Sequence, residues 1–596
     1  MVTGPPMLDT RVYRAAFVPV VLAVIVAAFA LAERPRPIGT TLAPDAFDGR
    51  RAFASLTELA RTFPRTRPGS PGDEALADRV QAQLRLSGFT VRSSSATAET
   101  VDGEQALRTV VAERAGLVDR RIVVVAARDT AVEDDRPRLS ATAALLELAR
   151  LYRGRPTRRT LTLVSTSGAT GGMAGVRELS GLLGGPVDAV IVLGDLAGDE
   201  RRAPYVIPWA DRGGLAPLRL RRTVEEAVRL ETGQDPGAPR ALLQVARLAV
   251  PVTRTGQGPL GGDGLSAVTL QVSGERGPDA TGEASVSRGR LQSAGRGLLR
   301  SISALDNGPD VPSGPREYVI FQRRVLPRWT VQVIGGLLLL PALVAAVDGL
   351  ARVRRRRQRV AVWLRWLVAA SLPFVLAVGF AKLLGLVGLV PPLAGGIDPD
   401  ALPPEAPALV ALVLVPVVGL VLRAPLARVL GAPSRPEPGE VPGAAAAVAL
   451  ASVLLAIGVW AFNPYTGLLL APAVHLWLLA AAPEIRLPRA VLAALVPLGL
   501  APFALVAVAY AAQFGLGPVE LLWQAALLLV GGTVGPLGAL AWSAVLACGL
   551  GALLVALRKP RAGPSAPDGD GPVSIRGPLS YAGPGSLGGT DSAFRR

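Results

Sequence analysis

Two kinds of hydrophobic pattern divide the chain. Between residues 45 and 328, short β-branched runs that favour buried strands alternate with stretches that place apolar residues at helical spacing. The expected strands are 89–91, 121–127, 160–166, 189–193 and 267–272, and the expected helices are 56–63, 73–87 and 142–152. Strands that alternate with helices predict an α/β domain with a mostly parallel sheet and helices on both faces.

Apolar runs of membrane-spanning length flank this domain. The run at 15–32 follows a short segment, 1–14, and is longer than the core of a signal peptide, so we expect an uncleaved transmembrane anchor. Residues 329–558 predict an all-α polytopic membrane domain with about seven spans. These spans are expected at 329–350, 360–390, 408–422, 444–462, 468–482, 490–512 and the second part of 519–557, whose first part, 519–531, is expected to be interfacial or re-entrant.

Basic residues follow the expected spans. Lys and Arg number 63 against 46 Asp and Glu, which gives a net charge of +17. The densest basic cluster, 352–359, directly follows an apolar run, as the positive-inside rule describes for cytoplasmic loops. No aromatic stacking platform accompanies this charge, so we expect contact with the lipid bilayer and no nucleic-acid binding.

The loops between the spans set the expected topology. Loops with arginines alternate with loops that have none, which predicts cytoplasmic N- and C-termini and an extracytoplasmic α/β domain. Residues 559–596 are rich in Gly, Pro and Ser and predict a disordered cytoplasmic tail. Arginine exceeds lysine, and Ala, Gly and Pro are abundant, a composition compatible with a GC-rich bacterial genome. We therefore expect a protein of the bacterial plasma membrane.

Residues 159–178, RTLTLVSTSGATGGMAGVRE, predict a strand, a tight turn and the start of a helix. Strand ends of this kind usually carry the chemistry of α/β enzymes. The turn at 168–172 nevertheless contains no acid, base, thiol or metal ligand. The single cysteine, Cys548, and the single histidine, His475, both lie in apolar runs of the membrane region and do not supply one.

The turn is one of several landmarks that come in a fixed order. An opening RPGSPG at 67–72 precedes an expected helix, and VAARD at 125–129 ends an expected strand. Together with the landmarks described next, these segments resemble the M28 family of zinc aminopeptidases. In that family a G-A-H-x-D strand end supplies a metal-binding histidine and a supporting acid, so the resemblance puts Ala127 in place of the histidine and retains Asp129.

Two further landmarks have lost their carboxylates. Residues 137–149 resemble the family's D-N-A-S-G-V-A-A-L-L-E-L-A segment, with Pro137 in place of the bridging aspartate. Residues 168–175, GATGGMAG, resemble its G-E-E-x-G-x-x-G turn, in which the first glutamate is the general base and the second is a metal ligand. Ala169 and Thr170 occupy these two positions.

The last two landmarks lie further along the chain. Asp195, in VLGDLAG, matches the aspartate of the family's D-M-V-G segment and is a retained ligand-type residue. TGQGPL at 255–260, followed by GLSA, resembles S-D-H-x-P-F followed by G-I-P-A, with Gln257 in place of the second histidine. The resemblance covers about residues 51–303.

The resemblance implies a degenerate site. Of the five ligand positions only Asp195 keeps a ligand-type side chain, the general base is absent, and Asp129 remains as the supporting acid. Neutral Gln and Thr side chains do not replace the histidines and carboxylates that hold a pair of zinc ions. We therefore expect no zinc, no other cofactor and no catalytic residue.

The order of anchor, soluble domain and polytopic domain resembles active membrane-bound M28 peptidases and also the Gaa-type subunit of the GPI-anchor transamidase, itself a degenerate member. We expect a non-catalytic membrane protein whose extracytoplasmic domain binds a protein or peptide partner or serves as an assembly platform. One alternative is an M28-type metallopeptidase with a rearranged metal site, which would use Asp129, Asp134, Asp135 and Asp195. Another is a transporter or lipid-handling bundle with an accessory soluble domain.

Overall fold

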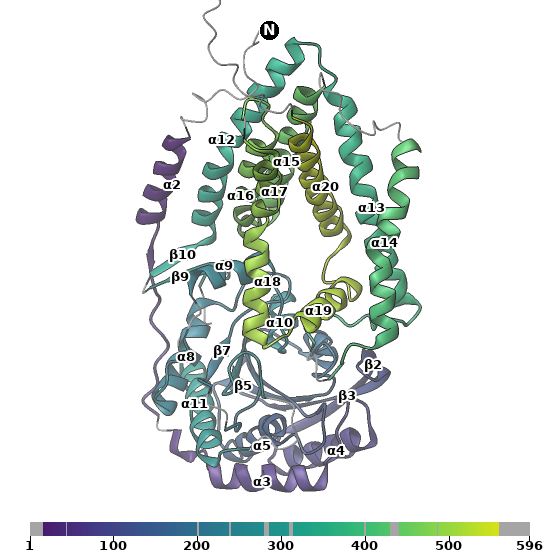
Figure 1. Cartoon of the computed structure of the whole chain (residues 1–596). Coiled ribbons are helices and arrows are strands. Elements are labelled where there is room, and N and C mark those ends of the chain that lie inside the picture. Colours follow the sequence, from purple (N-terminus) through teal and green to yellow (C-terminus); the bar gives the residue numbers. More distant parts are fainter. Residues whose placement is uncertain are drawn as a thin grey trace, which may run out of the picture.

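A computed structural model describes residues 16–42, 44–199, 202–237, 240–278, 285–308, 314–322, 324–397, 401–429, 440–485 and 487–559. In it, an α/β domain from the N-terminal half of the chain lies at one end of a bundle of apolar helices (Figure 1). The division into an α/β part and an all-α part is confirmed. The expected cytoplasmic segment 1–14 and nearly all of the expected disordered tail, 559–596, lie outside the described residues.

A seven-stranded sheet forms the centre of the α/β domain, with the strand order β2-β3-β5-β4-β6-β8-β7. The strands are β2 (Thr90–Thr100), β3 (Gly103–Arg114), β4 (Val118–Ala127), β5 (Arg159–Thr166), β6 (Val187–Leu193), β7 (Tyr205–Ile207) and β8 (Ala267–Gln271). Strands β5, β4, β6 and β8 run parallel, whereas the pairs β2–β3, β3–β5 and β7–β8 are antiparallel.

The expectation of a mostly parallel sheet is therefore corrected to a mixed sheet. All three antiparallel pairs contain β3 or β7, which the hydrophobic pattern did not predict. β3 follows β2 through a hairpin turn in which Thr100 pairs with Gly103. A connection this short joins only antiparallel strands.

Helices cover both faces of the sheet, as expected. One face packs against α3 (Gly49–Thr62), α4 (Pro71–Leu86), α5 (Arg136–Leu151), α8 (Leu218–Thr232) and α11 (Arg288–Asn307), and the other against α6 (Ala174–Arg177), α7 (Leu179–Leu182) and α10 (Gln257–Gly262). Alternation along β4 sends Ile122 and Val124 into the first core and Val123 and Val125 into the second. The carboxyl ends of the parallel strands lie between these two layers of helices, and the candidate site is found there.

Among the described residues, the bundle contains six helices that by length and composition can cross a membrane, or seven if one bent pair is counted as a single span. The six are α12 (Arg328–Arg355), α13 (Val360–Leu386), α14 (Ala406–Val429), α15 (Val441–Phe462), α16 (Pro464–Ala481) and α20 (Pro536–Arg558). The pair is α17 (Arg489–Gly499) and α18 (Ala501–Phe514), which meet at 48°. Pro497 and Gly499 lie at this break, where they weaken the helical hydrogen bonding. The chain is thus a multi-pass membrane protein.

Two apolar helices are shorter. α19 (Pro518–Val530) has 13 residues and coincides with the segment expected to be interfacial or re-entrant. α2 (Phe17–Phe29) also has 13 residues, fewer than the expected anchor at 15–32, and lies against α12. The chain leaves α2 early because β1 (Ala32–Glu33) pairs with β10 (Arg324–Pro327), the strand directly before α12.

This pairing belongs to a small sheet, β1-β10-β9, in which β9 spans Tyr318–Phe321. It holds together the two points at which the chain enters and leaves the α/β domain (Figure 1). The domain is therefore attached to the bundle through a paired stem and not through two independent linkers.

Candidate functional site

The carboxyl ends of the four parallel strands meet at a small cavity. Ala127, Thr166, Leu193 and Gln271 end these strands and line the cavity, whose volume is about 100 Å³. Gly396, from the loop between α13 and α14, also lines it, so the cavity lies where the domain meets the bundle. We call this space the strand-end cavity. Four more of the site positions expected from the sequence line it as well: Asp129, Ala169, Thr170 and Asp195. Two others, Pro137 and Gln257, do not.

The turn at 168–172 is fixed by Asp129. Its carboxylate accepts hydrogen bonds from the backbone N–H of Ala169 (3.0 Å), the backbone N–H of Thr170 (2.9 Å) and the Thr170 hydroxyl (2.9 Å). Asp129 is buried, and such a carboxylate needs partners of this kind. The retained acid is thus committed to holding the turn.

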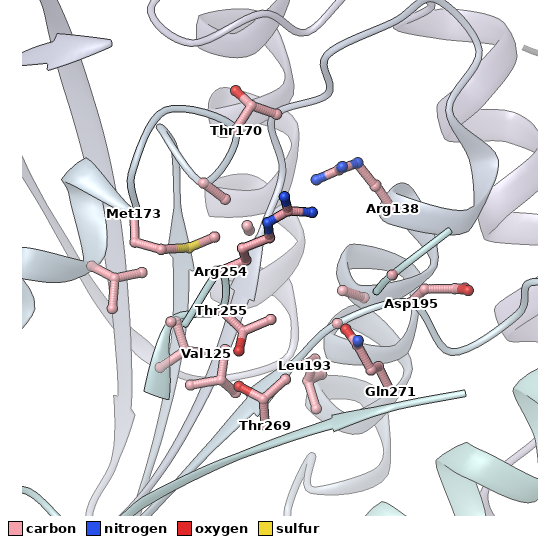
Figure 2. Close-up of a pocket in the computed structure, with 18 of the residues that line it drawn as sticks. Val125, Arg138, Thr170, Met173, Leu193, Asp195, Arg254, Thr255, Thr269 and Gln271 are labelled. Carbon is pink, nitrogen blue, oxygen red and sulfur yellow. The ribbon is translucent and has the colours of Figure 1, made fainter. Parts of the chain in front are cut away.

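Asp195 closes a turn at the end of β6. Its Oδ1 accepts hydrogen bonds from the N–H groups of Ala197 (2.9 Å) and Gly198 (2.8 Å). Burial raises the pKa of Asp195 to about 6, and the two backbone donors oppose this rise only in part. Its side chain points away from the guanidinium groups in the middle of the cavity (Figure 2).

Gln257 is the first residue of α10, and both the nitrogen and the oxygen of its side-chain amide form hydrogen bonds. Its Nε2 donates to the carbonyl of Trp209 (3.0 Å) and to the Thr253 hydroxyl (2.9 Å), and its Oε1 accepts from the Thr269 hydroxyl (2.5 Å). The glutamine therefore joins three segments of the core. It contributes no polar atom to the strand-end cavity.

The acidic residues upstream of α5 are also engaged in local structure. Asp135 caps α5 by accepting from the N–H of Arg138 (3.1 Å), and its other oxygen lies 2.9 Å from the Arg138 guanidinium. Asp134 pairs with Arg136 (3.1 Å). Neither acid lines the strand-end cavity, and Pro137 occupies the first turn of the helix, where its missing N–H costs nothing.

A buried ion pair supports the turn from behind. Arg128 Nε lies 2.7 Å from Asp73 Oδ1, and both side chains are 0% exposed. Asp73 also accepts a hydrogen bond from the Ser167 hydroxyl (2.7 Å), which links α4 to the residue directly before the turn. Burial raises the pKa of Asp73, while the neighbouring Arg128 guanidinium opposes that rise. The sequence pattern gave no sign of this pair.

Arginines contribute much of the charge in the lining of the cavity. Arg138 and Arg254 point toward one another across it (Figure 2). Arg276 and Glu275 complete the charged part of the lining. Sequence reasoning missed these four residues: Arg138 lies in the first turn of α5, ahead of the predicted helix start, and Arg254, Glu275 and Arg276 lie on loops that no periodic pattern describes. Within the described ranges, no group of three or more His, Cys, Asp and Glu side chains is arranged to hold a metal ion.

The loop after α13 of the bundle forms one side of the cavity. The N–H of Gly396 donates to the carbonyl of Thr253 (3.0 Å), and Arg177 joins the two sides by donating to the carbonyls of Gly172 (3.0 Å) and Ala394 (3.2 Å). A Cβ on Gly172 would lie only 2.4 Å from the Ala394 carbonyl oxygen. The turn at 168–172 is thus in direct contact with the membrane domain.

A second contact between domain and bundle contains a buried ion pair. Arg247, on α9 (Ala241–Ala249), pairs with Glu275, and the two side chains are 2% and 4% exposed. The Arg247 guanidinium lies over the rings of Tyr510 (4.9 Å) and Phe514 (5.4 Å) of α18. Gln513 of α18 donates to the other carboxylate oxygen of Glu275 (3.2 Å). Glu275, which lines the strand-end cavity, is therefore hydrogen-bonded to the membrane domain.

Comparisons with known proteins give matches only among solved structures. No family model and no curated protein matches the chain. A glutaminyl cyclase from Fimbriiglobus ruber is 15% identical, with a TM-score of 0.36, and covers 46% of this chain and 99% of its own. A glutaminyl cyclase from an Acidobacteriales bacterium is 18% identical, with a TM-score of 0.37 and the same coverage. The zinc aminopeptidase BSAP from Bacillus subtilis is 10% identical, with a TM-score of 0.35, and covers 43% of this chain and 94% of its own.

Proposed function

We propose that the protein is a non-catalytic member of the M28 group, whose extracytoplasmic α/β domain binds a partner and serves as an assembly platform on the membrane bundle. The observation that supports this most is the state of the strand-end cavity. Its retained carboxylates hold backbone turns, and the membrane domain contributes Gly396 to its lining. No described side chain in the lining is placed to act as a general base beside a metal pair.

The charges in the cavity also oppose a metal pair. Three arginines, Arg138, Arg254 and Arg276, line the cavity beside the carboxylates of Asp129, Asp195 and Glu275, so the lining has no excess of negative charge to attract divalent cations. Three hydrogen bonds already use most of the roughly four lone-pair positions of the Asp129 carboxylate, which leaves it little capacity to bind a metal ion. The alternative of a rearranged metallopeptidase site is therefore disfavoured.

The same charges suit an anionic group. Of the arginines in the lining, Arg138 is paired with Asp135 (2.9 Å), whereas Arg254 and Arg276 carry guanidinium groups of the kind that forms short, charge-assisted hydrogen bonds to a carboxylate. A space of this size accommodates one small group and not a whole peptide. We therefore propose that the partner inserts an acidic side chain or a C-terminal carboxylate here, while the rest of it contacts the outer surface of the domain.

Metal analysis of the purified full-length protein tests the non-catalytic part of this proposal. We expect less than stoichiometric zinc after dialysis, and neither aminopeptidase nor glutaminyl cyclase activity with added zinc. Stoichiometric zinc together with activity that Asp195→Ala abolishes would overturn the proposal. Asp102→Ala, at the exposed β2–β3 hairpin, is the matched control for the loss of a carboxylate.

Binding is tested with acidic and amidated peptides on the same protein. We expect peptides with a free C-terminal carboxylate to bind more tightly than their C-terminal amides, and Arg254→Gln to remove the difference. Arg61→Gln, at an exposed position of α3, is the control that should leave it unchanged. Equal binding of acids and amides would contradict the anionic ligand.

A further inference from the structure

The membrane bundle contains a second cavity, far more apolar than the first. It lies between α15, α16 and α20 and has a volume of about 470 Å³. Leu455, Phe462, Leu470, Leu537 and Trp542 contribute to its lining. Among the described residues that line it, only Asn463 and Thr466 have polar side chains with strong hydrogen-bonding groups, apart from the indole of Trp542. Its volume falls within the range of about 300–1,000 Å³ that is usual for small-molecule sites.

The hydrogen bonds of the two polar residues show where this bundle cavity lies along the helices. Asn463 Nδ2 donates to the carbonyl of Leu248 (3.0 Å), and the Thr466 hydroxyl donates to the carbonyl of Ala249 (2.7 Å). Both carbonyls belong to the end of α9 in the α/β domain. The bundle cavity therefore begins at the contact with the domain and extends along the half of each helix nearest to it. In a bilayer this is the leaflet on the domain side.

The bundle cavity is open toward the surroundings of the helices. Phe462 and Leu537, at its edge, are 83% and 76% exposed. Two glycines produce the hollow: nothing described lies within 4 Å of a Cβ built on Gly458, and a Cβ on Gly538 would meet only Val534. Because the rim belongs to membrane-spanning helices, the medium at the opening is lipid and not water.

The size and chemistry of the hollow select its occupant. Water is excluded because an apolar cavity offers it too few hydrogen-bond partners. A transmembrane helix is about 10 Å across, so even about 15 Å of its length fills roughly 1,200 Å³, which exceeds the space available. A hydrocarbon chain is thinner, and each CH₂ group that it buries contributes about 0.8 kcal/mol.

We propose that the bundle cavity binds one acyl chain of a phospholipid from the domain-side leaflet. The glycerol and headgroup then lie level with Asn463 and Thr466, at the contact between α16 and α9. The bound lipid lies beside the surface through which the α/β domain rests on the bundle. This inference concerns the bundle alone and does not depend on the function proposed for the strand-end cavity.

Lipid retention by the full-length protein tests the assignment. The protein is reconstituted in vesicles of phosphatidylcholine and phosphatidylglycerol that contain an acyl-chain spin-labelled phosphatidylcholine, then extracted in mild detergent. We expect the wild type to retain phospholipid, measured as phosphorus per chain, and to show a motionally restricted spin-label component. The double variant Gly458→Leu and Gly538→Leu fills the hollow and should lose both.

Gly379→Leu is the matched control, because it adds the same side chain to α13 at an exposed position where nothing described lies within 4 Å of the new Cβ. It should retain lipid as the wild type does. Equal retention by the filled variant and the control, with both proteins folded by gel filtration and thermal unfolding, would overturn the proposal.

A measurement on the unfilled cavity keeps the proposal testable if the double variant does not fold. Trp542 lines the bundle cavity, so phosphatidylcholine with brominated acyl chains should quench its fluorescence, taken as the difference between the wild type and Trp542→Phe. We expect this quenching to persist in mild detergent, where only bound lipid remains. Quenching that disappears on extraction, or a stoichiometric protein retained in place of lipid, would refute an acyl-chain site.

Discussion

The two cavities of this protein contrast in nearly every physical respect. The strand-end cavity is charged and has about 100 Å³ of space, and a loop of the membrane domain forms part of its lining, whereas the bundle cavity is apolar and has about 470 Å³. Buried polar groups require partners, so the polar residues of the strand-end cavity are held in a hydrogen-bonded network. Hydrocarbon requires none, so a hollow in the bundle can remain open.

The contrast extends to what each region does for the assembly of domain and bundle. At the strand ends, Arg177 and the turn at 168–172 contact the membrane domain, and Glu275 is held from α18. The carboxyl ends of the parallel strands are thus part of the joint between domain and bundle. The bundle cavity lies beside that joint without contributing charge to it.

The largest effect is expected from breaking the buried ion pair of the joint. Arg247→Ala leaves the Glu275 carboxylate buried without its guanidinium, and the loss of one partner from such a pair costs about 3–5 kcal/mol. Thermal unfolding of the full-length protein in detergent measures the change. Arg79→Ala is the control, because Arg79 pairs with Glu58 at 44% and 52% exposure, and surface pairs contribute about 0–1 kcal/mol.

If Arg247→Ala and Arg79→Ala have equal effects, the contact between α9 and α18 is not a stabilising joint. The same pair of variants also separates the two cavities. Lipid retention in the bundle should survive Arg79→Ala fully, and its loss in Arg247→Ala would show that the joint shapes the bundle cavity.

The next effect concerns the pH dependence of stability and comes from Asp195. Its pKa is raised to about 6 in the folded protein, above the usual value of a free aspartate, because the carboxyl is buried. Between about pH 4 and 6 the folded protein keeps a proton that the unfolded chain has released, so stability falls as pH rises through this window. Above it, the full cost of about 3 kcal/mol remains.

Asp195→Asn has no proton to lose and should remove this component. The variant should match the wild type below about pH 4 and be more stable above about pH 6, with the difference growing in between. Thermal unfolding at a series of pH values gives the curve. A bound divalent cation would lower the pKa instead, so a variant that is less stable above pH 6 would indicate a metal at the strand ends.

A smaller effect is expected where the turn touches the bundle. Gly172 has a φ of +74°, and a Cβ there meets the Ala394 carbonyl oxygen, so Gly172→Ala adds a clash to backbone strain. Gly103→Ala is the control, with a φ of +84° and nothing described within 4 Å of its Cβ. The difference between the two variants, about 1–3 kcal/mol by thermal unfolding, measures the contact alone. Equal losses of stability would mean that the loop after α13 moves to make room for the added methyl group at no cost in free energy.

The hydrophobic pattern predicted the elements whose burial is strongly periodic. The parallel strands β4, β5, β6 and β8 and the helix α5 all coincide with predicted segments. β3 was missed because its sequence, GEQALRTVVAER, has no clear period. Its strand conformation comes from pairing with β2 on one side and with β5 on the other, and the β5 contact is distant in the sequence.

Only the site residues that lie in segments matched by the resemblance could be predicted from the sequence. Ala127, Asp129, Ala169 and Thr170 lie on the strand ends that the resemblance marked, and all four line the cavity. The guanidinium groups that line it come from α5 and from two separate loops, and Gly396 comes from a loop of the membrane domain. Such contacts depend on how the domain rests on the bundle, which no local pattern encodes.

The smallest effect tests whether Thr170 is part of the fixed network. Thr170→Val keeps the shape of the side chain but removes the hydroxyl that donates to Asp129, which retains its two backbone donors. The expected loss is about 1.5 kcal/mol, the lower value for a hydrogen bond to a charged group. Thr170→Ser keeps the hydroxyl and should recover most of it. If Thr170→Val is neutral or stabilising by thermal unfolding, Asp129 does not need this donor. The carboxylate would then be available for other ligands, and the strand-end cavity would be less committed to structure than its hydrogen bonds indicate.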